Sequence, residues 1–200
     1  FDESDRDVDF GKLRHFFVSL ITDIIVYQPD GEESSVYQKI HKVMAQGLQK
    51  LSQSAGEDAP LVIVSHSLGA VIASNYMREL QNASAQNNKV TTHTSQSPST
   101  PLEKGETFAQ FYTFGTFLPL YSVRHETFTD PVQVPSPQFQ KRIQDDNVSL
   151  TTSPWINFYD RDDIFSLPLG FINDAYQQMV DDREVSVGGW LKSWNPLSHL

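Results

Sequence analysis

The chain has 200 residues and a formal net charge of −10, which disfavours a nucleic-acid partner or an anionic membrane surface. It contains no cysteine, which excludes disulfides, thiolate metal sites and a cysteine nucleophile and fits a cytoplasmic location. Hydrophobic residues make up 38% of the sequence, and no window approaches 18 uninterrupted apolar residues, so we expect one globular domain, residues 1–200, without a membrane span.

Two amphipathic helices are predicted before residue 60. Apolar residues recur at three- and four-residue spacing from Leu13 to Tyr27, where the turn signal Gln28-Pro29-Asp30-Gly31 ends the pattern. A second stripe with the same spacing predicts one face of a further helix and comprises Val36, Ile40, Val43, Met44, Leu48 and Leu51.

A strand, a turn and a helix are predicted next. The apolar run Leu61–Val64 follows Pro60 and is typical of a buried parallel strand. Helical spacing then returns at Leu68, Val71, Ile72, Tyr76 and Leu80. From Asn82 to Pro101 the residues are mainly Asn, Gln, Ser and Thr, so we interpret residues 82–107 as a polar surface insertion loop or lid.

The second half of the chain alternates predicted strands and helices. The strand candidates are Phe108–Phe114, Trp155–Tyr159 and Arg183–Val187, and the helix candidates are Gln138–Gln144 and Gly170–Val180. This alternation predicts an α/β fold with an open, mainly parallel sheet and helices on both faces.

The stretch LVIVSHSLGAVIAS, residues 61–74, has the layout of a nucleophile elbow. Such a turn presents a serine between a strand and a helix, with small residues two positions to either side, and Ser65 and Gly69 meet that need around Ser67. A serine nucleophile requires a general base and an acid that orients the base. Asp160, Asp162 and Asp163 follow an apolar strand, and His199 lies in a polar loop near the end of the chain.

Four segments together resemble the lipases and esterases of the α/β-hydrolase fold. They are VSHSLG, FYTFGTFLPLY, INFYDRDDIFSLPL and PLSH, in that order. The resemblance implies a three-layer sandwich and a small-molecule acyl ester as substrate. The sequence contains no Gly-rich phosphate loop, HExxH or EF-hand pattern, so it implies no cofactor and no metal. The resemblance also implies that Ser67 is the nucleophile, Asp163 the acid and His199 the base, with the backbone N–H of Leu68 in the oxyanion hole.

The sequence departs from this family at both ends. No strand ending in a His-Gly loop precedes the elbow, and no final helix follows His199, so we expect the intact protein to extend at both ends. Two alternatives stay open, a non-catalytic interaction or scaffold domain of the same fold and an enzyme that transfers the acyl group to an acceptor other than water. The oligomeric state also stays open.

Other candidate residues have plainer interpretations. We expect Asp160 and Asp162 to cap the turn after their strand. His66 should point away from the serine and make a structural contact. The remaining histidines lack metal-ligand spacing and are interpreted as surface or helix-face residues: His15, His41, His93 and His125.

Overall fold

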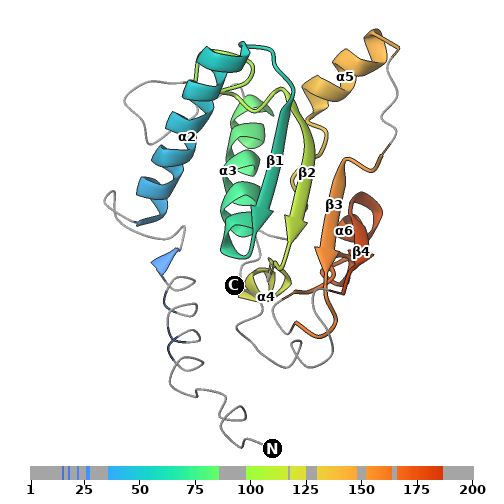
Figure 1. Ribbon diagram of the computed structural model, residues 1–200. Helices are drawn as coiled ribbons and strands as arrows, with labels where there is room; N and C mark the ends of the chain where they lie inside the picture. Colours follow the sequence, from blue (N-terminus) through green and yellow to red (C-terminus); the bar gives the residue numbers. More distant parts are fainter. Residues whose placement is uncertain are drawn as a thin grey trace, which may run out of the picture.

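A computed structural model describes residues 15, 18, 22, 26, 27, 36–85, 98–116, 118–124, 130–147, 152–163 and 166–186. Its centre is a four-stranded, all-parallel sheet of strand order β1-β2-β3-β4 (Figure 1). The strands are β1 (Leu61–His66), β2 (Phe108–Phe114), β3 (Trp155–Tyr159) and β4 (Asp181–Glu184). The helices are α2 (Val36–Ala55), α3 (Leu68–Ala85), α4 (Leu118–Arg124), α5 (Pro137–Asp145), α6 (Asp174–Met179) and the 3₁₀ helix η3 (Leu169–Phe171).

The predicted α/β architecture is confirmed. The bounds of β2 and β3 match the prediction, β1 continues to His66, and β4 begins at Asp181, two residues before the predicted strand. The connections between successive parallel strands contain helices, as parallel pairing requires. Each strand therefore ends at the same edge of the sheet, and in Figure 1 the arrowheads of β1, β2 and β3 point to one end.

The helix bounds differ from the predictions where local signals are weak. Helix α3 continues to Ala85, four residues into the segment interpreted as a loop or lid. The segment of residues 98–107 packs against the rest of the domain, because the side chain of Leu102 is fully buried. Residues 86–97 lie outside the described residues. Helix α5 begins at Pro137, where the side chain of Ser136 caps the N–H of Phe139. Helix α4 was not predicted.

The buried face of α2 differs from the predicted stripe. Val36, Val43 and Leu51 are 40%, 66% and 38% exposed, whereas the buried residues are Tyr37, His41, Leu48 and Ser52. The reason is that α2 contacts α3 through the polar aromatic side chains of Tyr37 and His41. A prediction based on the spacing of aliphatic residues does not include these side chains. Of the two interpretations of His41, a surface or a helix-face residue, the second agrees with its place on the buried face of α2 and the first is wrong, because His41 is 1% exposed.

Hydrogen bonds explain how His41 is buried. Its Nδ1 lies 2.8 Å from Glu79 Oε2 on α3, and its Nε2 lies 2.8 Å from the hydroxyl of Tyr27. Tyr37 donates a hydrogen bond of 2.6 Å to the other oxygen of Glu79. Burial raises the pKa of each of the two hydroxyls, Tyr27 and Tyr37, above the ordinary value for tyrosine, so both stay neutral. This cluster joins α2 to α3.

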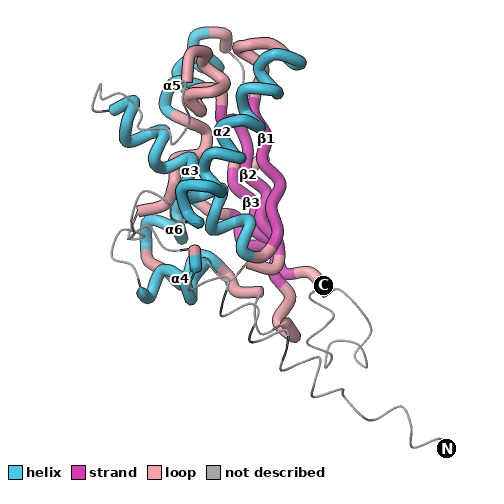
Figure 2. Tube along the Cα trace, turned by 90° about the vertical axis from the view of Figure 1, so that its left-hand side faces the viewer, coloured by secondary structure: helices cyan, strands magenta, loops and turns pink. Residues whose placement is uncertain are grey.

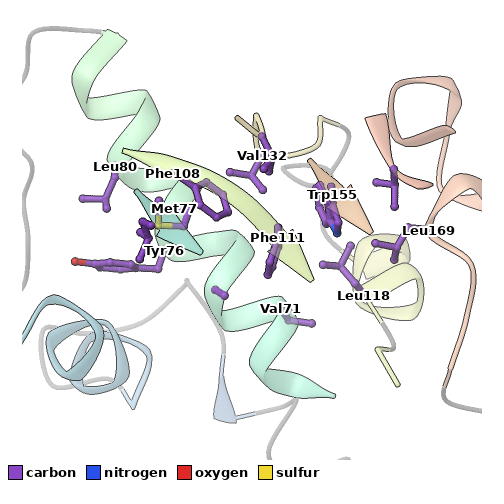
Figure 3. Close-up of a cluster of buried hydrophobic side chains, with 14 of the residues drawn as sticks. Val71, Tyr76, Met77, Leu80, Phe108, Phe111, Leu118, Val132, Trp155 and Leu169 are labelled. Atoms are coloured by element: carbon purple, nitrogen blue, oxygen red, sulfur yellow. The ribbon is translucent and has the colours of Figure 1, made fainter. Parts of the chain in front are cut away.

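The hydrophobic core lies between α3 and the sheet (Figure 3). Its centre is an aromatic group from the two middle strands, in which the rings of Phe111 and Trp155 are 4.9 Å apart. Trp155 also meets the ring of Tyr176 on α6 at 5.9 Å. Side chains from α3, α4 and η3 close around these rings: Val71, Met77, Leu80, Leu118 and Leu169.

The two faces of the sheet are covered unequally. Figure 2 shows α3, α4 and α6 on one side of the strands. On the opposite face Val62 and Val64 of β1 are 47% and 65% exposed, and Phe114 of β2 is 39% exposed. Within the described residues the expected helical cover is thus present on one face. No described helix is both long and apolar enough to span a membrane.

The N-terminal helix expected from Leu13 to Tyr27 lies largely outside the described residues. His15, Val18, Thr22 and Val26 are helical and exposed, while Tyr27 is buried.

We expect Gly105→Ala to lower the free energy of unfolding by about 1–3 kcal/mol. Gly105 has a φ of +70°, and a Cβ there would lie 2.7 Å from Met77 Cε and 3.2 Å from Leu80 Cδ1. Denaturant titration measures the loss. Gly56→Ala is the matched control, since Gly56 also has a positive φ, of +107°, but no atom within 4 Å of the added Cβ. Equal losses in both variants would show that the contact with Met77 costs nothing.

Candidate active site

The junction between β1 and α3 holds Ser67 in a backbone conformation that serine seldom adopts. Ser67 has a φ of 53°, in the left-handed region, which costs a non-glycine residue about 1–3 kcal/mol. Two hydrogen bonds hold this conformation: the N–H of Ser67 donates to Phe114 O at 3.2 Å, and the N–H of Ala70 donates to Ser67 O at 3.2 Å. A sharp strand-to-helix turn with a serine of positive φ is what the predicted nucleophile elbow requires.

The two small residues of the elbow pack against each other. A Cβ added to Gly69 would lie 3.8 Å from Ser65 Cβ, which is an ordinary van der Waals contact. The Ser65 hydroxyl oxygen is buried and has no hydrogen-bond partner among the described residues. Ser65 therefore fits the elbow by size, and its hydroxyl makes no bond that the turn requires.

We expect Ser65→Ala to leave Ser67 as reactive as before and to raise the free energy of unfolding by about 1 kcal/mol. The substitution removes a buried hydroxyl without a partner and keeps the Cβ that contacts position 69. Denaturant titration and the rate of Ser67 labelling by a fluorophosphonate measure the two quantities. A clear loss of stability would mean that the hydroxyl has a structural role.

The backbone at the start of α3 supplies hydrogen-bond donors beside Ser67. Leu68 is the first residue of this 18-residue helix, so its N–H belongs to the group that has no acceptor within the helix. The helix dipole also favours negative charge at this end. This is the N–H predicted for the oxyanion hole.

The loop after β3 distinguishes its three aspartates. Asp160 Oδ1 accepts the N–H of Asp162 at 3.0 Å, so Asp160 caps the turn as expected, and Asp162 is exposed. Asp163 is half-buried, its N–H donates to Asp160 O at 3.1 Å, and its carbonyl accepts the N–H of Ser166 at 3.0 Å. Asp160 is half-buried as well, so burial separates Asp162 from the other two, and the cap that Asp160 makes separates Asp160 from Asp163.

Ser67 and Asp163 lie at the same edge of the sheet. Ser67 directly follows β1, Asp163 is four residues beyond the end of β3, and β2 lies between these strands (Figure 1). The ends of β1 and β3 are two strand spacings apart, or about 10 Å. His199 lies outside the described residues.

Another histidine near Ser67 has a structural contact. His66 stacks on Phe114 with ring centroids 5.1 Å apart, and these two residues are register partners of β1 and β2. Side chains alternate along a strand, so His66 and Ser65 occupy opposite faces. This agrees with the expected structural role of His66.

A groove of about 770 Å³ lies away from this edge. Its lining includes Arg78, Gln81 and Gln133, and the amide of Gln81 bonds both the N–H and the carbonyl of Gln133. Arg78 is eleven residues beyond Ser67 along α3, which corresponds to about 16 Å. The groove is therefore separate from the candidate site.

Comparisons with known proteins give no further identification. No protein-family model matches the chain, and no curated protein or solved structure matches it. Within the described residues, no group of three or more His, Cys, Asp and Glu side chains is arranged to hold a metal ion.

Proposed function

We propose that the protein is a serine hydrolase of the α/β-hydrolase type that cleaves a carboxylic ester or a related acyl substrate. The observation that carries the proposal is the φ of 53° at Ser67, between a parallel strand and a long helix. This strand was expected to be buried, but it lies at the end of the described strand order and is exposed on one face, at Val62 and Val64. A strained non-glycine residue of this kind is characteristic of functional sites. A serine between a strand and a helix, with small residues at 65 and 69, supports the assignment of Ser67 as the nucleophile.

The order of the strands supports the same proposal. The nucleophile follows β1, the acid follows β3, and the proposed base His199 comes after β4 in the sequence. Sites in open parallel sheets form at the carboxyl ends of the strands. The role of His199 rests on sequence order and on the resemblance of PLSH to the histidine segment of lipases.

The proposed reaction has two steps. Ser67 Oγ attacks the acyl carbonyl while His199 takes the hydroxyl proton, the leaving alcohol receives that proton, and an acyl-enzyme remains. Water then attacks the acyl-enzyme, with His199 again as base, and releases the carboxylic acid and free Ser67. Asp163 orients the imidazole and stabilises its charged form, and the Leu68 N–H stabilises the oxyanion in both steps.

Mass spectrometry after treatment with an alkyl fluorophosphonate tests the proposal. The expected result is one phosphonyl adduct on the peptide that contains Ser67, retained in Ser65→Ala and absent from Ser67→Ala. Labelling that persists in Ser67→Ala would exclude Ser67 as the nucleophile. A folded wild-type protein that takes up no label and hydrolyses no ester would favour the non-catalytic interaction domain.

A further inference from the structure

A row of polar side chains crosses the sheet just below its carboxyl edge. In the strand register, Thr113 of β2 pairs with Asn157 of β3, and Asn157 pairs with Asp182 of β4. Thr113 and Asn157 are fully buried, and Asp182 is half-buried. Burying such groups is unfavourable unless they are hydrogen-bonded, so their partners determine what the row does.

The hydrogen bonds of this row have a defined direction. Trp155 Nε1–H can only donate, and it donates to Thr113 Oγ1 at 3.3 Å. The Thr113 hydroxyl in turn donates to Asn157 Oδ1 at 2.9 Å, which fixes the amide orientation. Asn157 Nδ2 therefore faces the far side, where it donates to Asp182 Oδ1 at 2.7 Å and to Leu167 O at 3.1 Å.

The carboxylate of Asp182 holds the segment that follows the acid loop. Its Oδ1 accepts the N–H of Leu169 at 2.9 Å, and its Oδ2 accepts the N–H of Gly170 at 2.8 Å. A Cβ on Gly170 would lie 3.2 Å from Oδ2, so the backbone approaches the carboxylate closely. Together Asn157 and Asp182 attach residues 167, 169 and 170 to the interior of the sheet.

The acid loop is also closed across its base and attached to the segment that follows β2. The N–H of Asp160 donates to the buried hydroxyl oxygen of Ser166 at 3.1 Å, and the N–H of Leu167 donates to Thr116 O at 3.3 Å. Asp163 lies between these attachments. Apolar side chains at the positions of the row would pack without a desolvation cost, so stability alone does not explain why these residues are polar. Hydrogen bonds have a direction, and those of the row fix the path of the backbone beyond Asp163.

We propose that Asn157 and Asp182 are positioning residues, which hold the loop of residues 160–170 so that the carboxylate of Asp163 meets the catalytic base. The inference rests on the proposed function. Neither side chain touches the reacting atoms, and both act through the loop. Loosening the loop misaligns Asp163 in the transition state and leaves the binding of the ester unchanged, so kcat falls while KM stays the same.

The test compares Asp182→Asn with Asp181→Asn in the full chain. The variants remove neighbouring charges of β4, but Asp181 pairs with Arg183 at 2.7 Å on the surface and makes no described contact with the loop. Hydrolysis of p-nitrophenyl acetate is measured per competent site, counted by fluorophosphonate uptake. We expect kcat of Asp182→Asn to fall about 10- to 100-fold with KM unchanged, and Asp181→Asn to match the wild type.

Amide hydrogen exchange supplies a readout independent of catalysis. In Asp182→Asn the amides of Leu169 and Gly170 should exchange about 10-fold faster or more, and in Asp181→Asn they should not change. Should Asp182→Asn fail to fold, Thr113→Val carries the test, because it keeps the side-chain volume and removes the bond that orients Asn157. We expect kcat of Thr113→Val to fall about 3- to 10-fold.

The outcomes separate the two proposals. An unchanged kcat in Asp182→Asn, or in Thr113→Val where the first variant does not fold, overturns the positioning role and leaves the serine hydrolase intact. A fall in kcat with an equal rise in KM also overturns it, because the loop would then shape the binding surface. A wild-type protein without activity or labelling overturns the proposed function and, with it, the positioning role.

Discussion

Replacing Ser67 by alanine is expected to lower kcat/KM for p-nitrophenyl acetate by at least about 10³-fold. The alanine side chain has no oxygen to form the acyl-enzyme, and it keeps the backbone N–H and O of residue 67, which make the two hydrogen bonds described for the turn. Initial rates at several ester concentrations give kcat/KM, and circular dichroism checks the fold. Ser65→Ala, two residues away in the same turn, is the control and should keep wild-type activity. A Ser67→Ala variant with at least a tenth of the wild-type activity would contradict the assignment.

The strained backbone of Ser67 leads to a second prediction for the same residue. Glycine adopts a φ of 53° freely, so Ser67→Gly should be inactive and yet more stable than the wild type by about 1 kcal/mol. An ordinary turn serine offers no reason for such a strained backbone. Gain of stability with loss of activity at one position is the expected behaviour of a residue whose conformation serves catalysis.

Local sequence signals predicted the elements that form the elbow. An apolar run before the turn, small residues at 65 and 69 and helical spacing from Leu68 each act within a few residues, so the sequence alone locates β1, Ser67 and α3. The parallel order of the strands also follows from alternation of strand and helix. These features depend little on contacts between distant segments.

Contacts between distant segments account for what the sequence did not predict. The partners of His41 are Tyr27 and Glu79, which lie 14 and 38 residues away, so the buried face of α2 differs from its aliphatic stripe. The row through Thr113, Asn157 and Asp182 depends on the register of three strands. The local sequence feature that indicates this row is the single asparagine within the otherwise apolar and aromatic strand WINFY.

The choice of the acid depends partly on local sequence signals and partly on the surroundings of the side chains in the fold. The sequence located three aspartates after β3, and the family resemblance selected Asp163, but spacing alone does not separate them. Their surroundings separate them in part: Asp162 is exposed, Asp160 and Asp163 are both half-buried, and the Asp160 carboxylate caps the turn. A difference in environment of this kind is what distinguishes a carboxylate with a catalytic role from its neighbours.

Asp163→Asn is therefore expected to lower kcat by about 10²- to 10⁴-fold, with little effect on KM. An amide in place of the carboxylate neither stabilises the imidazolium nor fixes the tautomer in which the base faces Ser67. The rate of p-nitrophenyl acetate hydrolysis measures the loss.

Asp160→Asn and Asp162→Asn are matched controls from the same loop. An asparagine at 160 still accepts the N–H of Asp162, so the turn persists, and position 162 is exposed. Both controls should keep activity within about 3-fold of the wild type, since surface changes cost little. Loss of activity in Asp160→Asn or Asp162→Asn, with Asp163→Asn active, would transfer the acid role to that residue and leave Ser67 as the nucleophile.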